Sequence, residues 1–190
     1  MIAVLQRDMP FFQSSGGGVT IAGGEPSMHY RFSRELVRKC RENSIHTTFD
    51  TCGYAIGKPA RLLAEADLLL YDLKLIDEEA HIRLTGVGNR PILDNLRVLV
   101  EMRKPIIVRV PIVPGLTDSD ENISGIGSLL SGLDTIQRVD LIAFHKFAIS
   151  KYAVLNKSNV FDSIEPPTGL EMDRIKLELE SFGLKVQLGG

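Results

Sequence analysis

Each of five short apolar runs in this 190-residue sequence is followed by, or contains, residues that can bind a charged ligand. These residues are Gly23, Gly24, Glu25, Asp50, Thr51, Asp72, Lys74, Arg109 and His145. They supply three carboxylates, three basic side chains and the exposed backbone of two glycines. Such a set suits a small zwitterionic or phosphate-bearing ligand. No Ser-His-Asp order and no cysteine beside a histidine accompanies them, so the pattern does not indicate nucleophilic catalysis.

Each of these positions also has an ordinary structural explanation. A pair such as Gly23-Gly24 more often marks a tight turn, Asp50 could cap a helix, and a histidine at a strand end such as His145 is more often structural. Asp72 could form a structural ion pair. Arg109 is harder to explain in this way, because a guanidinium inside an apolar strand needs a partner. A structural explanation is reasonable for any one of these positions, but it is less plausible that chance placed polar groups at five successive strand ends.

The five apolar runs predict buried β-strands. They are short, and three are rich in β-branched residues, which is typical of parallel strands covered on both faces. The predicted strands are 19–22, 45–49, 68–71, 106–110 and 139–144. The carboxyl ends of parallel strands meet at one edge of a sheet, where such folds place their active sites. We therefore expect the ligand-binding candidates to lie together at that edge.

Helical patterns lie between the predicted strands. Apolar residues recur at helical spacing in segments 36–40, 92–100, 123–130 and 172–182. The first of these helices is predicted to begin at Ser33. The pairs Asp118 with Glu121 and Thr168 with Glu171 resemble capping boxes for the third and fourth. The alternation of strand and helix predicts an α/β fold with a parallel sheet and right-handed crossovers.

Composition restricts the class of protein. The sequence is 44% hydrophobic and 24% charged, with a formal net charge of −2, which excludes a disordered chain and argues against a nucleic-acid partner. No apolar run approaches the ~18 residues of a membrane span, and no signal peptide is visible, so a cytoplasmic location without membrane contact is expected. Two cysteines are too few for a disulfide framework. The length predicts one domain over residues 1–190.

An ordered set of motifs resembles a known family. Its members are Ser15–Pro26 with its Gly-Gly-Glu, Asp50–Tyr54, Tyr71–Lys74, Leu84–Val87, Arg109–Gly115, Phe144–Lys146 and Gly183–Val186. The Gly-Gly-Glu segment is similar to that of radical S-adenosylmethionine (SAM) enzymes. The whole set most resembles the glycyl-radical-enzyme activating enzymes, typified by pyruvate formate-lyase activating enzyme. The resemblance covers nearly the whole chain from about Asp8 onward.

The resemblance implies a fold and a site. The fold would be a partial (β/α) barrel of radical SAM type. SAM would be bound by Gly23, Gly24 and Glu25 at its amino-acid end, and by Asp50, Asp72, Lys74, Arg109 and His145 elsewhere in the pocket. A monovalent cation beside the SAM carboxylate would be held by Asp50, Thr51, the carbonyl of Leu70 and Asp72. Hard oxygen ligands suit such an ion.

The resemblance also implies a reaction. In this family a reduced [4Fe-4S] cluster gives one electron to SAM, which cleaves to methionine and a 5′-deoxyadenosyl radical. That radical takes a hydrogen atom from a glycine Cα of a partner glycyl radical enzyme of the formate-lyase type. A flavodoxin- or ferredoxin-like protein would donate the electron. The cofactors carry this chemistry, so no side chain of the chain is expected to act as acid or base.

One departure from the family pattern has consequences. The family holds its cluster with a Cys-x3-Cys-x2-Cys motif, whereas this sequence has only Cys40 and Cys52. We therefore expect a barrel that lacks its first βα unit and its cluster ligands, and that is inactive alone. The first predicted strand would then be an open edge that favours self-association. Two rival interpretations are an inert SAM- or nucleotide-binding α/β module and a plain α/β metabolic enzyme with an anion site.

Overall fold

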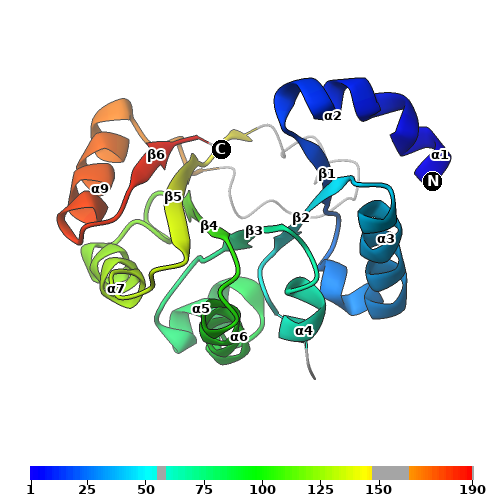
Figure 1. Ribbon diagram of the computed structural model, residues 1–190. Helices are drawn as coiled ribbons and strands as arrows, with labels where there is room; N and C mark the ends of the chain where they lie inside the picture. The colour runs from blue at the N-terminus through cyan, green and yellow to red at the C-terminus, as the bar shows by residue number, and fades with distance from the viewer. Residues whose placement is uncertain (55–58, 147–162, 190) are drawn as a thin grey trace.

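A computed structural model of the chain describes residues 1–54, 59–146 and 163–189. Six parallel strands form one sheet, in which the spatial order follows the chain order. The strands are β1 (Gly18–Ile21), β2 (His46–Thr51), β3 (Leu68–Asp72), β4 (Ile106–Ile112), β5 (Ile136–Ala143) and β6 (Val186–Leu188). The sheet curves into an open arc with β1 and β6 at its two ends, which is the shape of a partial barrel (Figure 1).

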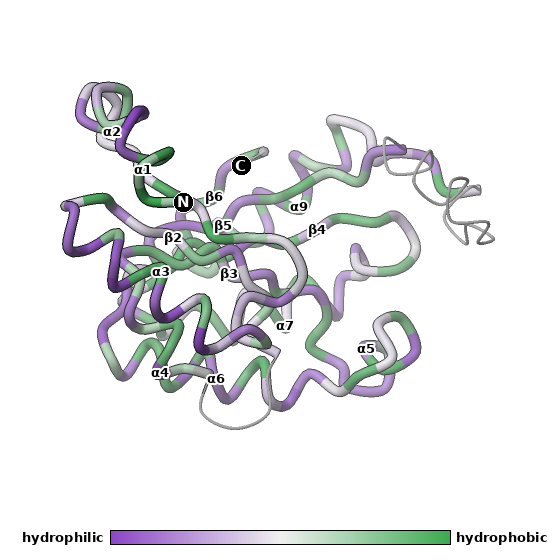
Figure 2. The backbone as a smooth tube through the Cα atoms, turned by 90° about the vertical axis from the view of Figure 1, so that its right-hand side faces the viewer, coloured by the Kyte–Doolittle hydropathy of each residue, from purple (hydrophilic) through white to green (hydrophobic). Residues whose placement is uncertain are grey.

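Helices follow the strands and cover the convex side of this arc (Figure 1). Their colouring alternates between hydrophilic and hydrophobic, as expected for helices with one buried face (Figure 2). These elements are η2 (Pro26–His29), α3 (Tyr30–Glu42), α4 (Pro59–Leu63), α5 (Glu78–Thr85), α6 (Arg90–Glu101), α7 (Asp120–Leu130) and α9 (Gly169–Ser181). Before β1 the chain forms α1 (Ile2–Leu5), η1 (Gln6–Asp8) and α2 (Met9–Ser15).

The α/β fold with a parallel sheet is confirmed, and all five predicted strands are present with shifted ends. Strand β6 was not predicted as a strand. It contains three residues, one of them Gln187, and so carries almost no periodic signal. Within the described ranges β1 pairs only with β2, and self-association through its other edge stays a prediction. No helix in those ranges is long and apolar enough to span a bilayer.

Two helix starts differ from the prediction. Helix α3 begins at Tyr30, and Ser33 lies inside it, where its buried hydroxyl donates to the Pro26 carbonyl at 2.8 Å. Helix α7 begins one residue after Ser119, whose hydroxyl caps it, while Asp118 accepts from a loop amide instead. For α7 the cause is that Asp118 and Ser119 can each cap a backbone amide, whereas α3 begins at Tyr30 without any side-chain cap. The capping box that begins α9 at Thr168 is confirmed.

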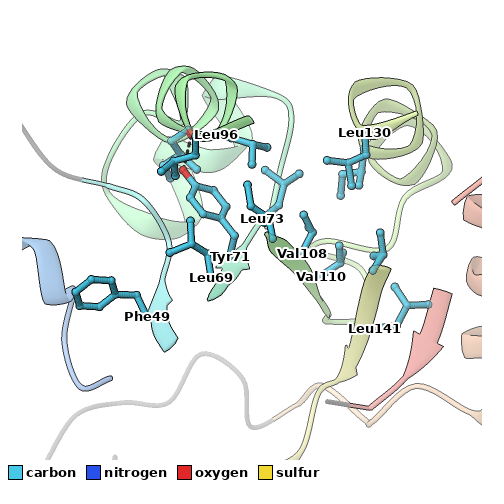
Figure 3. Packing of buried hydrophobic residues seen from close by; sticks show 14 of the residues in the cluster. Phe49, Leu69, Tyr71, Leu73, Leu96, Val108, Val110, Leu130 and Leu141 are labelled. Carbon is cyan, nitrogen blue, oxygen red and sulfur yellow. Dashed lines mark hydrogen bonds between the residues drawn. The ribbon is translucent and has the colours of Figure 1, made fainter. Parts of the chain in front are cut away.

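Alternate residues of the strands face opposite sides of the sheet. One set packs under the helices and forms the core, which includes Phe49, Leu69, Tyr71, Val108, Val110 and Leu141 (Figure 3). The other set faces the concave side of the arc. Among the residues that the structure describes, Tyr71 is the largest fully buried side chain, and its hydroxyl donates to the Ile92 carbonyl at 2.6 Å. Burial raises the pKa of Tyr71, so this hydroxyl keeps its proton.

Gly53 lets the end of β2 pass close to Tyr71. Its φ of +69° favours glycine, and a Cβ at this position would lie 1.8 Å from the Tyr71 hydroxyl oxygen. We expect Gly53→Ala to lower the free energy of unfolding by about 3 kcal/mol. The cost of a steric clash with Tyr71 and the cost of a left-handed backbone at alanine add together. Urea denaturation measures this change. Gly132→Ala is the matched control, because its Cβ would meet nothing within 4 Å. Equal losses in the two variants would contradict the role given to Gly53.

Candidate functional site

The predicted ligand-binding residues lie at or just beyond the carboxyl ends of the strands, except Arg109, which lies in the middle of β4. Gly23 and Gly24 follow β1, Asp50 lies near the end of β2, and Asp72 is the last residue of β3. His145 follows β5 and is exposed. A parallel sheet gathers all these ends on one rim, as the sequence predicted.

Strand register then brings four of them into direct contact. Asp72 pairs across the sheet with Arg109, and Asp50 lies one strand further along. The Arg109 guanidinium donates through Nε to Asp72 Oδ1 at 2.8 Å and through Nη2 to Asp50 Oδ1. Its Nη2 also forms an ion pair with Asp72 Oδ1 at 2.7 Å. The Lys74 ammonium lies 3.8 Å from Asp72 Oδ2. We call Asp50, Asp72, Lys74 and Arg109 the rim cluster.

The rim cluster is about three-quarters buried and electrically balanced. The side chains of Asp50, Asp72 and Arg109 are 29%, 27% and 22% exposed. Burial alone would lower the pKa of Arg109, but the two carboxylates outweigh burial and raise it. Arg109 is therefore a permanent cation between two carboxylates. The sequence argument that a guanidinium inside an apolar strand needs a partner is confirmed.

Glu25 is held by donors of its own chain. Its Oε1 accepts from the hydroxyls of Ser27 and Thr51, each at 2.7 Å, and its Oε2 accepts from the Cys52 amide at 3.0 Å. The Cys52 thiol lies 3.3 Å from the same oxygen. Burial, and then Glu25, raises the pKa of that thiol, although a backbone hydrogen bond from Tyr54 opposes the rise. The Glu25 carboxylate thus ties the turn after β1 to the end of β2.

The turn between β1 and η2 exposes its backbone. Gly23 has a φ of +129°, and a Cβ on Gly23 or on Gly24 would meet nothing within 4 Å. Open space above a glycine backbone allows close approach by a ligand group. Because Glu25 links this turn to Thr51, the turn is fixed relative to the rim cluster one strand away.

A cavity of about 520 Å³ lies on the concave side of the sheet, and Asp72 and Arg109 lie on its wall. Sequence reasoning missed two further charged residues there, Arg138 and Asp140 of β5. Asp140 is 1% exposed and accepts from Arg138 Nε at 2.7 Å and Nη2 at 3.1 Å. The signal was available, because charged residues alternate with apolar ones along β5 and one face of that strand is therefore polar.

The chain's residues do not fit a [4Fe-4S] cluster. Such a cluster takes three or four thiolates, and the sequence has two cysteines. Cys40 is buried in α3, whereas Cys52 lies on the rim beside Glu25. In the described part of the chain, no group of three or more His, Cys, Asp or Glu residues could hold a metal ion.

Comparison with known proteins places the chain in a family. Residues 7–124 match the radical SAM superfamily. The trans-4-hydroxy-L-proline dehydratase activating enzyme of Clostridioides difficile is 34% identical over 194 residues, which cover 100% of this chain and 64% of that relative. The pyruvate formate-lyase-activating enzyme of Clostridium pasteurianum is 35% identical over 165 residues, which cover 87% of this chain and 69% of that relative. The chain thus spans about two thirds of the length of these relatives.

A solved structure agrees with the fold. A domain of the pyruvate-formate lyase-activating enzyme from Bacteroides vulgatus ATCC 8482 superimposes with a TM-score of 0.77 at 28% identity. The match covers 92% of this chain and 99% of that domain. The chain therefore belongs to the radical SAM superfamily and, within it, to the glycyl-radical-enzyme activating enzymes.

Proposed function

We propose that this chain binds SAM at its rim and is the SAM-binding part of an activating enzyme that generates a glycyl radical on a partner enzyme. The observation that carries the proposal is the rim cluster, which sets Asp50, Asp72, Lys74 and Arg109 beside an open glycine turn. The relatives supply the context, because they are activating enzymes of pyruvate formate-lyase and of trans-4-hydroxy-L-proline dehydratase.

The charges of the rim match those of the amino-acid end of SAM. An α-ammonium group needs oxygen acceptors, which the carbonyls of Gly23 and Gly24 and the free carboxylate oxygens of the rim cluster offer. An α-carboxylate needs cationic hydrogen-bond donors, and Lys74 and Arg109 are the two cationic side chains of the rim cluster. Glu25 would act by holding the glycine turn in place, since donors of its own chain occupy its oxygens. His145, at the end of β5, is assigned to the same pocket by family resemblance.

A monovalent cation is part of the proposal. Carboxylate and carbonyl oxygens are the right donors for such an ion. The Oδ2 atoms of Asp50 and Asp72 would hold it together with Thr51 and the carbonyl of Leu70, since Arg109 contacts only the Oδ1 atoms. The ion would share Asp72 Oδ2 with the Lys74 ammonium. The Thr51 hydroxyl donates to Glu25 and accepts from the Gly53 amide, which leaves one oxygen lone pair for the ion.

The electron for SAM cleavage is not supplied by groups on this chain, whose two cysteines do not fit a cluster. In activating enzymes of this family, a [4Fe-4S] cluster would supply that electron, and a flavodoxin- or ferredoxin-like protein would be its reductant. The residues of this chain hold SAM and orient it toward the partner. The absence of cluster ligands favours a second candidate function, an inert module that binds SAM without chemistry.

Calorimetric titration of SAM tests the proposed site. We expect Asp72→Asn to weaken SAM binding about 30-fold, because a hydrogen bond to a charged group contributes roughly 1.5 to 3 kcal/mol. Asp134→Asn is the matched control, because Asp134 pairs with Arg103 on the surface and its side chain is 67% exposed. The control should change the affinity less than about twofold. Equal affinities for the two variants would rule out the rim cluster as the SAM site.

A further inference from the structure

A second cavity opens on the rim beside the rim cluster. It encloses about 230 Å³ between the loops that follow β3 and β4, and Leu84 at the end of α5 contributes to its wall. Its other apolar walls include Val113 and Leu116, and Lys74 stands at its edge. Neither the sequence patterns nor the family relationship assigns a role to this cavity.

Buried polar residues fix the walls of this cavity. The Thr117 hydroxyl accepts from the Val113 amide at 2.8 Å and donates to the Pro111 carbonyl at 2.6 Å. Asn122 donates to the carbonyls of Lys74 and Thr117 at 2.9 and 2.8 Å. These bonds fix the loop after β4 in shape and tie both loops to Asn122 of α7. The cavity is therefore preformed and presents mainly apolar surface.

The Leu84–Val87 segment is fixed in the same way. The Thr85 hydroxyl donates to the His81 carbonyl at 2.8 Å, and the buried His81 imidazole lies 2.8 Å from the Val87 carbonyl through Nδ1. This segment is one of the motifs in the sequence, and the proposed SAM site leaves it unused. The Thr85 hydroxyl and the Val87 carbonyl of this segment contact His81, and the Leu84 side chain lines the cavity.

The cavity is next to the proposed SAM site. Pro111 lines both this cavity and the larger one on the concave side of the sheet. Lys74 belongs to the rim cluster and also stands at the cavity edge, with its side chain 35% exposed. Its ammonium lies 3.8 Å from Asp72, so donor capacity remains for a neighbouring carbonyl oxygen.

We propose that this cavity takes one apolar side chain of the partner polypeptide, close in sequence to the glycine that is activated. The inference rests on the proposed function, because that function brings a glycine backbone to the rim. The volume suits one side chain, since pockets for whole small ligands span roughly 300 to 1,000 Å³. A peptide carbonyl beside the buried side chain would accept from Lys74. An apolar pocket with one hydrogen-bond donor at its edge suits an apolar side chain and its neighbouring peptide carbonyl. It suits a charged small molecule other than SAM less well.

Titration with capped dipeptides tests the proposal. The probes are N-acetyl-glycyl-leucinamide and N-acetyl-glycyl-aspartic acid amide, added to the ¹⁵N-labelled chain with saturating SAM and followed by NMR. We expect the leucine probe to shift the amide signals of Leu84, Thr85 and Thr117 with a dissociation constant on the order of millimolar. The aspartic acid probe should bind at least about tenfold more weakly, because its charge would have to be desolvated.

Two variants of α5 locate the binding. Leu84→Asp places a charge on the cavity wall and should weaken the leucine probe about tenfold. Ile82→Asp is the matched control, because Ile82 is 47% exposed, Leu84 is 42% exposed, and only Leu84 lines the cavity. Leu116→Ala provides a second, uncharged test and should weaken the probe about threefold. The spectrum of each variant reports its folding directly.

The outcomes separate this inference from the proposed function. Loss of the leucine-probe signal only in Leu84→Asp and Leu116→Ala, with SAM binding retained, supports the cavity. Equal responses in Leu84→Asp and Ile82→Asp, or equal responses to the two probes, overturn it while the SAM site stands. Failure of SAM to bind the wild-type chain overturns the proposed function, and with it the assignment of the cavity to a partner.

Discussion

Replacing Arg109 with alanine is expected to abolish SAM binding and to destabilise the chain. Arg109 is the cation between Asp50 and Asp72, and the three side chains are less than one-third exposed. Its removal leaves the two carboxylates with only the Lys74 ammonium, 3.8 Å from Asp72, as a counter-charge, which costs about 3 kcal/mol. It also removes a cationic donor from the proposed carboxylate site. We expect SAM affinity to fall at least about 100-fold, as measured by calorimetry.

A surface ion pair provides the control for Arg109. Arg103 also pairs with an aspartate, Asp134, but its side chain is 72% exposed. Arg103→Ala should change the free energy of unfolding by less than about 1 kcal/mol and leave SAM binding unchanged. Arg109→Lys separates charge from geometry, because lysine keeps the charge but cannot span both carboxylates as the guanidinium does. Full SAM affinity in Arg109→Ala would refute the role of the rim cluster.

Iron–sulfur reconstitution of this chain is expected to yield no stable cluster. The reason is the thiolate count, since the sequence contains only Cys40 and Cys52. The two are also unsuited to a common cluster, because Cys40 is buried in α3 among core side chains and Cys52 bonds to Glu25 on the rim. Burial raises the pKa of both thiols, which opposes metal binding because a thiolate is the ligand.

The measurement is electron paramagnetic resonance of the reduced, desalted chain after anaerobic treatment with iron and sulfide. A relative with an intact Cys-x3-Cys-x2-Cys motif, treated in parallel, shows that the procedure works. Cys52→Ser should give the same blank spectrum as the wild-type chain. A cluster signal that survives desalting in the wild type and disappears in Cys52→Ser would contradict this account.

The strands and the rim were predictable because their signals are strong and local. The runs that became β3 and β4 are almost uniformly apolar, and buried parallel strands require this pattern. Asp72 and Arg109 are the charged residues within these two apolar strands, so they were readily recognised as candidates. The topology predicts only that the two lie on neighbouring strands, and their contact depends on the register that places Arg109 opposite Asp72.

Other features depend on tertiary contacts that leave little trace in the sequence. The internal role of Glu25 arises because the end of β2 passes within hydrogen-bond distance, through Thr51 and Cys52. The pairing of Asp140 with Arg138 was visible only as alternation within a strand that otherwise appeared apolar. Short elements such as α4 have too few residues for a periodic pattern and form because neighbouring elements pack against them.

Titration of SAM into the purified wild-type chain, without iron, is the decisive experiment for the proposed SAM site. We expect saturable binding, because this chain contains the rim cluster, the glycine turn and the Glu25 hydrogen bonds that hold the turn. SAM should bind more strongly than adenosine, since the charges of the rim cluster complement the α-ammonium and α-carboxylate groups of SAM, which adenosine lacks. Absence of any binding heat at concentrations well above those of the protein would contradict the account.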